Sequence, residues 1–237
     1  MHELSQEVLA RLRGKFIVFD GCDGSGKGAQ MRLLVDALIS HDIPCVTARD
    51  PGGTPIGDRI RHVLLGHDLS EMDVRCEALL FMASRAQLLH EVIGPALAKN
   101  VACICDRYVS ATCAYQGAAG FDPKRVVELA AFAIGDVWPD HTIIIDLPPK
   151  AGFARTGRKP RAERKRSNAV AQGQPTLFHD VETDAMEARP LKFHNRVRRT
   201  FLELPAYYPA PVSIVDGSGT IDDVHARVME ALADASF

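Results

Sequence analysis

The sequence predicts an α/β fold with a central five-stranded parallel sheet and helices on both faces. Short apolar runs recur along the chain, and stretches with helical spacing of apolar residues separate them. This alternation is typical of parallel sheets, because parallel neighbours need a crossover connection that is usually a helix. The 237 residues are enough for one large domain and too few for two, so residues 1–237 are expected to form a single domain.

The predicted strands and helices alternate in order. The five strand candidates are residues 16–20, 43–48, 101–105, 141–147 and 212–215. Helical spacing predicts helices over about residues 4–13, 27–40, 55–65, 123–134, 186–204 and 221–232, a long helix after Asp73 and a short one that contains Thr112. Thr54 and Asp73 stand where N-caps are expected, because their side-chain oxygens can accept from the free amides of a first helical turn.

The most informative stretch joins the first predicted strand to the first long helix. Gly21, Gly24 and Gly26 allow left-handed or tightly turned backbone, so that successive N–H groups can converge on an anion. The stretch fits the phosphate-loop pattern GxxxxGK, because four residues separate Gly21 from Gly26 and Lys27 comes next. Where that pattern continues with a magnesium-binding serine or threonine, the chain has Gly28. A glycine-rich turn without a ligand is the alternative interpretation.

A second candidate site element follows the second predicted strand. Residues 49–55 hold two glycines and two prolines, which force an irregular loop at the carboxyl end of a strand, where parallel sheets bind ligands. Arg49 at this place is a candidate phosphate clamp, because its planar fork matches phosphate oxygens. The alternative is a surface arginine beside a turn.

Two further pairs carry chemistry. Asp106 and Arg107 end the third strand, so the carboxylate can hold magnesium, directly or through water, and the guanidinium can grip a second phosphate. Phe81 and Arg85 are four residues apart on one helical face, where stacking and hydrogen bonding suit a planar base. For that second pair, an apolar core residue beside a snorkelling arginine is the alternative.

The composition excludes several function classes. A formal net charge of −2 gives no general attraction to nucleic acid, and no apolar run approaches the roughly 20 residues of a membrane span. The six cysteines match no zinc spacing, which favours reduced thiols and a cytoplasmic location. Residues 155–166 contain seven basic residues and one acidic residue, Glu163. A basic segment of this kind indicates a lid, and a disordered surface loop or a nucleic-acid-binding arm are the alternatives.

Several stretches together resemble the thymidylate kinase family of P-loop nucleoside monophosphate kinases. The resemblance covers nearly the whole chain, and the stretches that carry it are Phe-Asp-Gly-Cys-Asp-Gly-Ser-Gly-Lys (19–27), Arg-Asp-Pro-Gly-Gly-Thr (49–54), Phe-Met-Ala-Ser-Arg-Ala-Gln (81–87), Asp-Arg-Tyr (106–108), Ala-Tyr-Gln-Gly (114–117) and Phe-His-Asn-Arg-Val-Arg (193–198). It implies a three-layer P-loop kinase fold, a lid at about residues 155–186, ATP and dTMP as substrates, Mg²⁺ as cofactor, and a homodimer.

The resemblance also implies roles for individual residues. ATP would contact Gly21, Cys22, Asp23, Gly24, Ser25, Gly26, Lys27, Gly28 and Arg155. Arg49 and Arg107 would hold the dTMP phosphate, Phe81 would stack on thymine and Arg85 would hydrogen-bond the base. Thr112 and Gln116 would lie near the base edge, and Tyr115 would crowd the 2′ position. Asp23 would meet the acceptor sugar or the metal, and Asp106 would support magnesium. The positive charge at the transferred group would come from magnesium, Lys27, Arg49, Arg107 and the lid arginines, Arg158 or Arg161.

The implied reaction moves the γ-phosphoryl group of ATP to dTMP, giving dTDP and ADP on the route to dTTP. Three positions depart from the family pattern, namely Gly28, Ala185 in place of a common arginine, and Phe201 in place of tyrosine. Gly28 leaves two possibilities, a water that replaces the missing hydroxyl at magnesium or a weakly active nucleotide-binding relative. Another nucleoside monophosphate or deoxynucleoside kinase on the same fold is the nearest alternative function.

Overall fold

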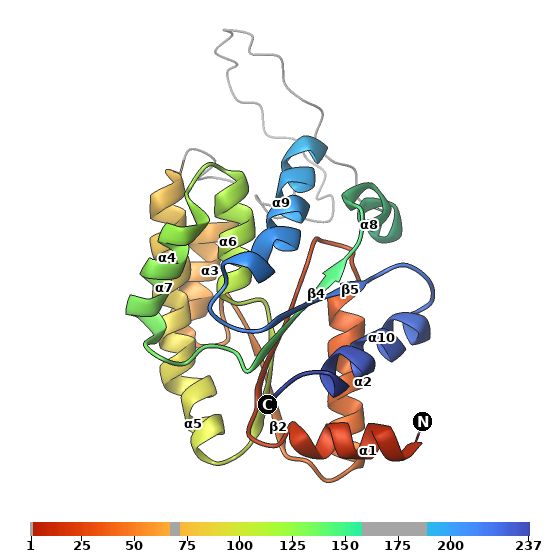
Figure 1. Cartoon of the computed structure of the whole chain (residues 1–237). Coiled ribbons are helices and arrows are strands. Elements are labelled where there is room, and N and C mark those ends of the chain that lie inside the picture. Colours follow the sequence, from red (N-terminus) through yellow and green to blue (C-terminus); the bar gives the residue numbers. More distant parts are fainter. Residues whose placement is uncertain (1, 67–71, 158–188) are drawn as a thin grey trace, which may run out of the picture.

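The computed structural model describes residues 2–66, 72–157 and 189–237. At its centre is a five-stranded sheet in the order β2-β3-β1-β4-β5, and all four neighbouring pairs are parallel (Figure 1). The strands are β1 (Phe16–Asp20), β2 (Cys45–Arg49), β3 (Ala102–Asp106), β4 (His141–Asp146) and β5 (Val212–Asp216). The predicted fold class is confirmed.

Helices precede, connect and follow these strands. They are α1 (His2–Arg11), α2 (Lys27–Ser40), α3 (Pro55–Leu65), α4 (Val74–Leu88), α5 (Gly94–Ala98), α6 (Val109–Ala118), α7 (Pro123–Ile134), α8 (Pro149–Thr156), α9 (Leu191–Glu203) and α10 (Ile221–Ala233), with a π-helical turn η2 (Leu89–Ile93) and a 3-10 turn η3 (Leu204–Ala206). The predicted N-caps are confirmed, because Thr54 accepts from the Gly57 amide at 2.9 Å and Asp73 from the Arg75 amide at 3.0 Å. None of the helices in the described ranges is long and apolar enough to cross a membrane.

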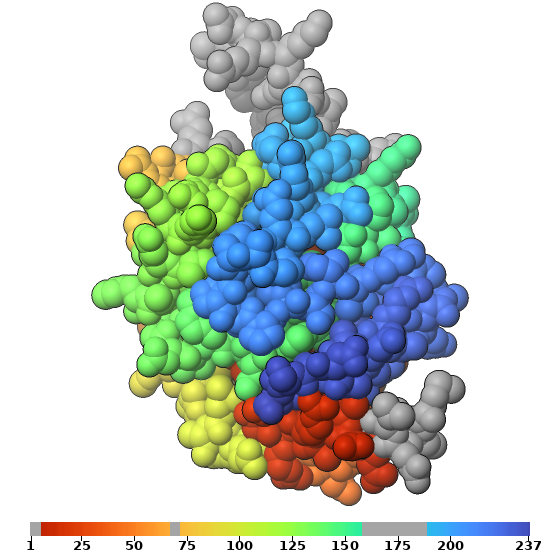
Figure 2. Space-filling view, viewed as in Figure 1, coloured from red at the N-terminus to blue at the C-terminus, as the bar shows by residue number. Residues whose placement is uncertain are grey.

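The sheet separates two apolar cores. Side chains alternate along β1, so Phe16 and Val18 face one core while Ile17 and Phe19 face the other. Helices α4, α6, α7 and α9 cover the first face, and α1, α2 and α10 cover the second. In the space-filling view α9 lies across the front of the molecule between the green helices and α10 (Figure 2). The result is a helix-sheet-helix arrangement of three layers.

The cysteines follow this arrangement. Cys103 and Cys105 of β3 are both buried in the core under α4 and α6, which confirms that alternation places them on one face. All six cysteines are free thiols. Cys22, Cys103, Cys105 and Cys113 are buried, Cys45 is half-buried, and Cys76 on α4 is exposed.

Besides shifts of one or two residues at other element ends, three differences from the prediction have a physical reason. Strand β2 begins at Cys45 rather than at residue 43, because Pro44 has no N–H to donate and Ile43 already belongs to the buried turn after α2. Helix α8 was not predicted, although Pro149 at its first position is a typical helix start. Helix α9 begins at Leu191, since Pro190 interrupts the predicted helix from 186, whose first residues lie outside the described part.

All five strands end on a charged residue at the same edge of the sheet. These residues are Asp20, Arg49, Asp106, Asp146 and Asp216. The carboxyl edge of an open parallel sheet is where ligands bind, so these charges mark the place of the functional site.

Candidate active site

The glycine-rich loop after β1 has the backbone that the sequence predicts. The φ angles of Gly21, Gly24 and Gly26 are 133°, 74° and 102°, a region that favours glycine. A Cβ at Gly24 would lie 2.2 Å from the carbonyl oxygen of Gly152 in α8. Position 24 therefore requires glycine for two reasons, its positive φ and the close packing of the loop against the backbone of α8.

Lys27 begins the helix that follows this loop. Its side chain is held inside the loop, where Nζ donates to the carbonyl oxygens of Gly21 at 3.1 Å and Cys22 at 3.2 Å. Burial and the nearby charge of Arg107 lower the pKa of Lys27, and surrounding carboxylates oppose the shift. A buried cation at a helix N-terminus, among loop amides, is suited to bind phosphate.

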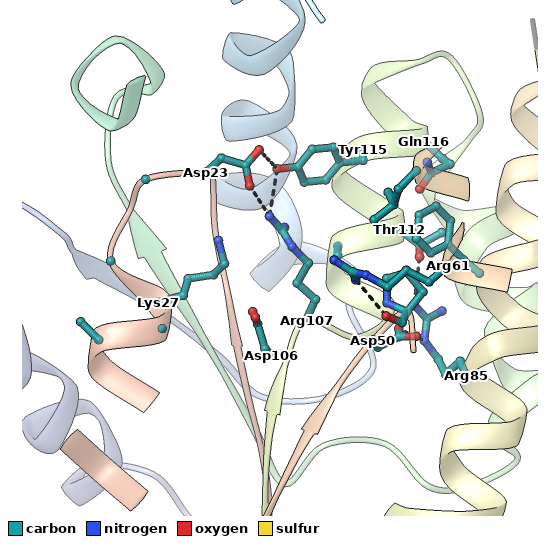
Figure 3. Close-up of a pocket in the computed structure, with 18 residues that line it drawn as sticks. Asp23, Lys27, Asp50, Arg61, Arg85, Asp106, Arg107, Thr112, Tyr115 and Gln116 are labelled. Carbon is teal, nitrogen blue, oxygen red and sulfur yellow. Dashed lines mark hydrogen bonds and ion pairs between the residues drawn. The ribbon is translucent and has the colours of Figure 1, made fainter. Parts of the chain in front are cut away.

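A cavity of about 380 Å³ opens beside the loop (Figure 3). Lys27 and Arg107 both line it, so the two predicted phosphate contacts face one space. The cavity also brings together side chains from α4 and α6 that were predicted to bind the acceptor nucleotide, namely Phe81, Arg85, Thr112, Tyr115 and Gln116. The structure therefore brings these predicted residues together around one cavity, and their individual roles remain predictions.

Arg107 follows β3 and reaches back over the loop. Its guanidinium donates to the carboxylate of Asp23, to Asp20 at 3.2 Å and to the hydroxyl of Tyr115 at 3.3 Å. Burial alone would lower the pKa of Arg107, but Tyr115 and the two carboxylates raise it well above its ordinary value. Arg107 is therefore a fixed cation whose fork is oriented by groups on three elements.

Asp23 and Tyr115 complete this network. The Tyr115 hydroxyl donates to Asp23 Oδ2 at 3.0 Å, and the Arg107 guanidinium lies 5.0 Å from the centroid of the Tyr115 ring. Burial acts to raise the pKa of Asp23, but the charges of Arg107 and Lys27 outweigh it and lower the pKa. Phe201, at a position where the family usually has tyrosine, packs edge-on against Tyr115 at 6.2 Å.

Arg85 is fully buried in α4 and bonded on every nitrogen. Its Nε donates to Asp50 Oδ2 at 2.7 Å, and Nη2 donates to the same carboxylate, to the Tyr108 carbonyl and to the Thr112 hydroxyl, the last two at 3.0 Å. Nη1 is different, because its acceptor is the sulfur of Met82 at 3.0 Å. Nη1 is thus the nitrogen with an N–H left for a base in the cavity.

The predicted pairing of Phe81 with Arg85 holds only in part. Both line the cavity, but the Arg85 guanidinium lies over the ring of Tyr108, 5.1 Å from its centroid. Phe81 instead packs with Leu64 of α3. Phe81 therefore keeps a ring face for stacking, whereas Arg85 is anchored within the protein.

Asp106 is placed to support a metal ion. It lines the cavity, and its Oδ1 is buried without a hydrogen-bond partner among the residues that the structure describes. Asp20, at the end of the neighbouring strand β1, accepts hydrogen bonds from Ser110 at 2.8 Å, from the Gly21 amide at 2.9 Å and from Arg107. The described residues contain no group of three or more His, Cys, Asp or Glu side chains that could hold a metal. These donors fit magnesium, which usually binds one or two carboxylates, waters and substrate phosphates.

Two further predicted residues, Arg49 and Arg155, lie outside the lining of this cavity. Arg49 is exposed on the edge strand β2 and lines a neighbouring cavity of about 450 Å³, which shares Gly28 and Asp106 with the first. Arg155 at the end of α8 donates to the Gly217 carbonyl at 3.1 Å, outside the lining of the first cavity. The predicted lid arginines, Arg158 and Arg161, and the position Ala185 lie outside the described residues.

Sequence reasoning missed four residues with a structural part in the site: Asp20, Asp50, Glu77 and Gly152. Asp20 ends a strand at the ligand-binding edge, which is a signal that could have found it. Asp50 and Glu77 act through partners 35 and 39 residues away, and no local pattern indicates such contacts.

A parallel sheet whose glycine loop, buried lysine and fixed arginine face one cavity defines a kinase of the P-loop class. A family model described as thymidylate kinase matches residues 19–228, which is most of the chain. The chain belongs to the thymidylate kinase family.

Individual relatives agree with this assignment. A thymidylate kinase of Syntrophotalea carbinolica is 38% identical over 221 residues, which cover 93% of this chain and 95% of that protein. A thymidylate kinase of Nitratidesulfovibrio vulgaris is 37% identical over 220 residues, with 92% and 95% covered. The crystal structure of thymidylate kinase from Ehrlichia chaffeensis is 28% identical, superposes with a TM-score of 0.67, and matches 92% of this chain and 98% of its own.

Proposed function

We propose that this protein transfers the γ-phosphoryl group of ATP to the 5′-phosphate of dTMP, which yields dTDP and ADP. The observation that carries the proposal is that Lys27 of the glycine loop and Arg107 line the same cavity as the candidate base-binding side chains of α4 and α6. Two polyanions can therefore meet in one space that is lined by a buried lysine and a half-buried arginine. The family assignment supports the same reaction.

The protein's task in such a transfer is positioning and charge neutralisation, because phosphoryl transfer needs no covalent enzyme intermediate. Under this proposal the loop amides and Lys27 hold the donor phosphates, and Arg107 holds the acceptor phosphate. The Phe81 ring stacks on thymine, and Tyr115, fixed by Asp23 and Arg107, fills the space beside the sugar. Asp106 with its unpartnered oxygen would hold Mg²⁺, which neutralises charge on the transferred phosphoryl group when bound.

A coupled assay tests the proposal. ADP formation from ATP and magnesium is measured with and without dTMP, and the expected result is ADP release that depends on dTMP. ATP binding with no dTMP-dependent ADP release would instead identify a non-catalytic nucleotide-binding relative.

Another nucleoside monophosphate kinase is the alternative within the same class. Parallel assays with dTMP, dUMP, dCMP, dGMP and UMP separate the two. We expect dTMP to be preferred and UMP to be a poor substrate, because the Tyr115 ring, anchored by Asp23 and Arg107, would crowd a 2′-hydroxyl. Equal rates on ribonucleotides would contradict that role of Tyr115.

Replacing Gly28 by threonine is expected to lower the magnesium concentration that gives half-maximal activity by about ten-fold, the scale on which metal sites respond to a lost or gained contact. A Cβ at Gly28 would meet nothing closer than Arg32 Nη1 at 3.7 Å, so the position accepts a side-chain carbon without a clash. Gly28→Ala is the matched control, because it adds the Cβ without the hydroxyl ligand. Identical magnesium titrations of the wild type and Gly28→Thr would contradict this prediction.

The remaining parts of the proposal concern organisation. We infer one domain over residues 1–237, in which α8 and α9 flank a lid at about residues 155–186 that supplies Arg158 or Arg161 to the transferred group. We also infer a cytoplasmic homodimer that needs no nucleic acid or membrane. Size-exclusion chromatography with light scattering tests the dimer, and a monomeric mass at working concentration would argue against it.

A further inference from the structure

The amide of Gln116 is held in one orientation at the wall of the cavity. Gln116 is fully buried on α6 and lines the cavity together with Thr112, one turn earlier (Figure 3). Its Nε2 donates to Oε2 of Glu77 at 3.2 Å. Its Oε1 is buried without a hydrogen-bond partner among the described residues. The amide therefore presents an unused acceptor.

Glu77 determines which end of that amide points away from it. Glu77 is only 7% exposed, and its other oxygen, Oε1, accepts from Arg189 at 2.8 Å. A carboxylate paired with a guanidinium offers acceptors only, so it can take the NH₂ end of an amide and not the carbonyl end. The orientation of Gln116 thus follows from the charge of Glu77.

Arg189 is itself fixed in place. Its guanidinium lies 4.7 Å from the centroid of the Phe193 ring, on the first turn of α9. The ion pair between Glu77 and Arg189 joins α4 to the start of α9, and α6 packs against α9. The Glu77 carboxylate is therefore fixed by Arg189 on one oxygen and by Gln116 on the other.

We propose that Glu77 is a positioning residue that makes the base site selective for pyrimidines that carry an N3–H donor. The inference deepens the proposed function and rests on it, because it takes the acceptor base to lie between Phe81 and Gln116. A thymine or uracil base offers N3–H to the free Oε1 of Gln116. A cytosine base offers a lone pair at N3, which would face that oxygen and leave both acceptors unsatisfied.

Without the carboxylate, the amide of Gln116 can rotate by a half turn and exchange its donor for its acceptor. Glutamine at position 77 has both a donor and an acceptor end, so it can pair with either orientation of the Gln116 amide. Glu77→Gln keeps the volume of the side chain. It removes the carboxylate that accepts only from the NH₂ end of the Gln116 amide. Selectivity at N3 should fall, whereas the anchoring of Arg85 by Asp50 is untouched.

The experiment compares dTMP with 5-methyl-dCMP, which keeps the 5-methyl group and the sugar but has no N3–H. The ratio of kcat/KM for the two nucleotides is measured in the wild type, in Glu77→Gln, and in Glu128→Gln. The last variant is the matched control, since Glu128 is exposed on α7 and undergoes the same chemical change. We expect the ratio to fall about ten-fold in Glu77→Gln, a discrimination of the size that one misplaced contact gives, and to stay constant in the control.

A swap variant separates positioning from simple structural support. Glu77→Gln/Gln116→Glu places an acceptor back at the cavity and a donor at position 77, whose own oxygen still accepts from Arg189. We expect this double variant to recover the preference for dTMP over 5-methyl-dCMP. An unchanged ratio in Glu77→Gln, or equal losses on both nucleotides without recovery in the swap, overturns the inference.

Equilibrium binding of both nucleotides is measured in parallel. Failure of the proposed reaction can then be distinguished from failure of the proposed role of Glu77. Absence of turnover in the wild type with selective dTMP binding counts against the proposed reaction alone. The melting temperature of Glu77→Gln shows whether this variant has lost stability. If it has, the ratio of the affinities of the swap variant for dTMP and 5-methyl-dCMP tests the inference instead. Equal binding of dTMP and 5-methyl-dCMP by the wild type would contradict the role of Glu77 directly.

Discussion

Replacing Arg107 by methionine lowers kcat/KM for dTMP by about 10³-fold or more, the size of effect that an arginine at a transferring phosphoryl group has in related chemistry. Methionine keeps much of the length of the side chain and removes its charge. Without Arg107, the dTMP phosphate would enter a cavity in which the carboxylates of Asp23 and Asp20 have lost their shared cation. The measurement is steady-state kinetics with the coupled ADP assay over a range of dTMP concentrations.

Arg107→Lys is the control for charge alone. Lysine supplies a point charge but not the fork that bridges Asp20, Asp23 and Tyr115, so an intermediate loss is expected. Melting temperatures of both variants, and their affinity for ATP, separate a lost phosphate contact from a collapsed loop. A methionine variant with near wild-type kcat/KM would show that Arg107 does not hold the acceptor phosphate.

The glycine loop illustrates what a local pattern can predict. Its chemistry is encoded within a few neighbouring residues, because Gly21, Gly24 and Gly26 adopt the positive φ angles that their spacing suggests. The central strands β1, β3 and β4 were predictable for a similar reason, since strands that are buried on both faces are largely apolar. Local backbone preference and burial are properties that a sequence shows directly.

Contacts between distant segments were not predictable in that way. Gly24 needs to be glycine partly because Gly152 lies against it, and nothing near either residue indicates this contact. Arg49 lies at the ligand-binding edge as expected, but its strand β2 is an edge strand, and its side chain lines the neighbouring cavity. The carboxyl edge could be located from sequence, whereas the direction of each side chain depends on strand order.

Arg85 is a residue whose place beside the cavity was predictable from sequence, whereas its main partner within the protein was not. The spacing from Phe81 placed Arg85 on the cavity side of its helix, which is where it lies. The sequence could not show that the guanidinium is buried against Asp50, because the two residues come together only when α4 packs beside the loop after β2. That contact makes Arg85 part of the protein's stability as well as its site.

Replacing Asp50 by alanine is therefore expected to lower the free energy of unfolding by about 3–5 kcal/mol, since it leaves an uncompensated charge in the interior. Both side chains of the Asp50–Arg85 pair are 1% exposed, so water cannot replace the lost carboxylate. Burial alone would lower the pKa of Arg85, but the attraction of Asp50 raises it, so the guanidinium stays charged while the pair is intact. Urea unfolding followed by circular dichroism measures the loss.

The paired variant Asp50→Leu/Arg85→Met distinguishes the burial of an unpaired charge from the loss of a contact. Removing both charges leaves an apolar interior, and such replacements are often neutral or stabilising. We expect the double variant to unfold at a urea concentration near that of the wild type, although it loses the donor that the base site needs and binds dTMP poorly. If Asp50→Ala and the double variant were equally unstable, the loss would come from packing and hydrogen bonds, and Arg85 would not depend on Asp50 for its charge.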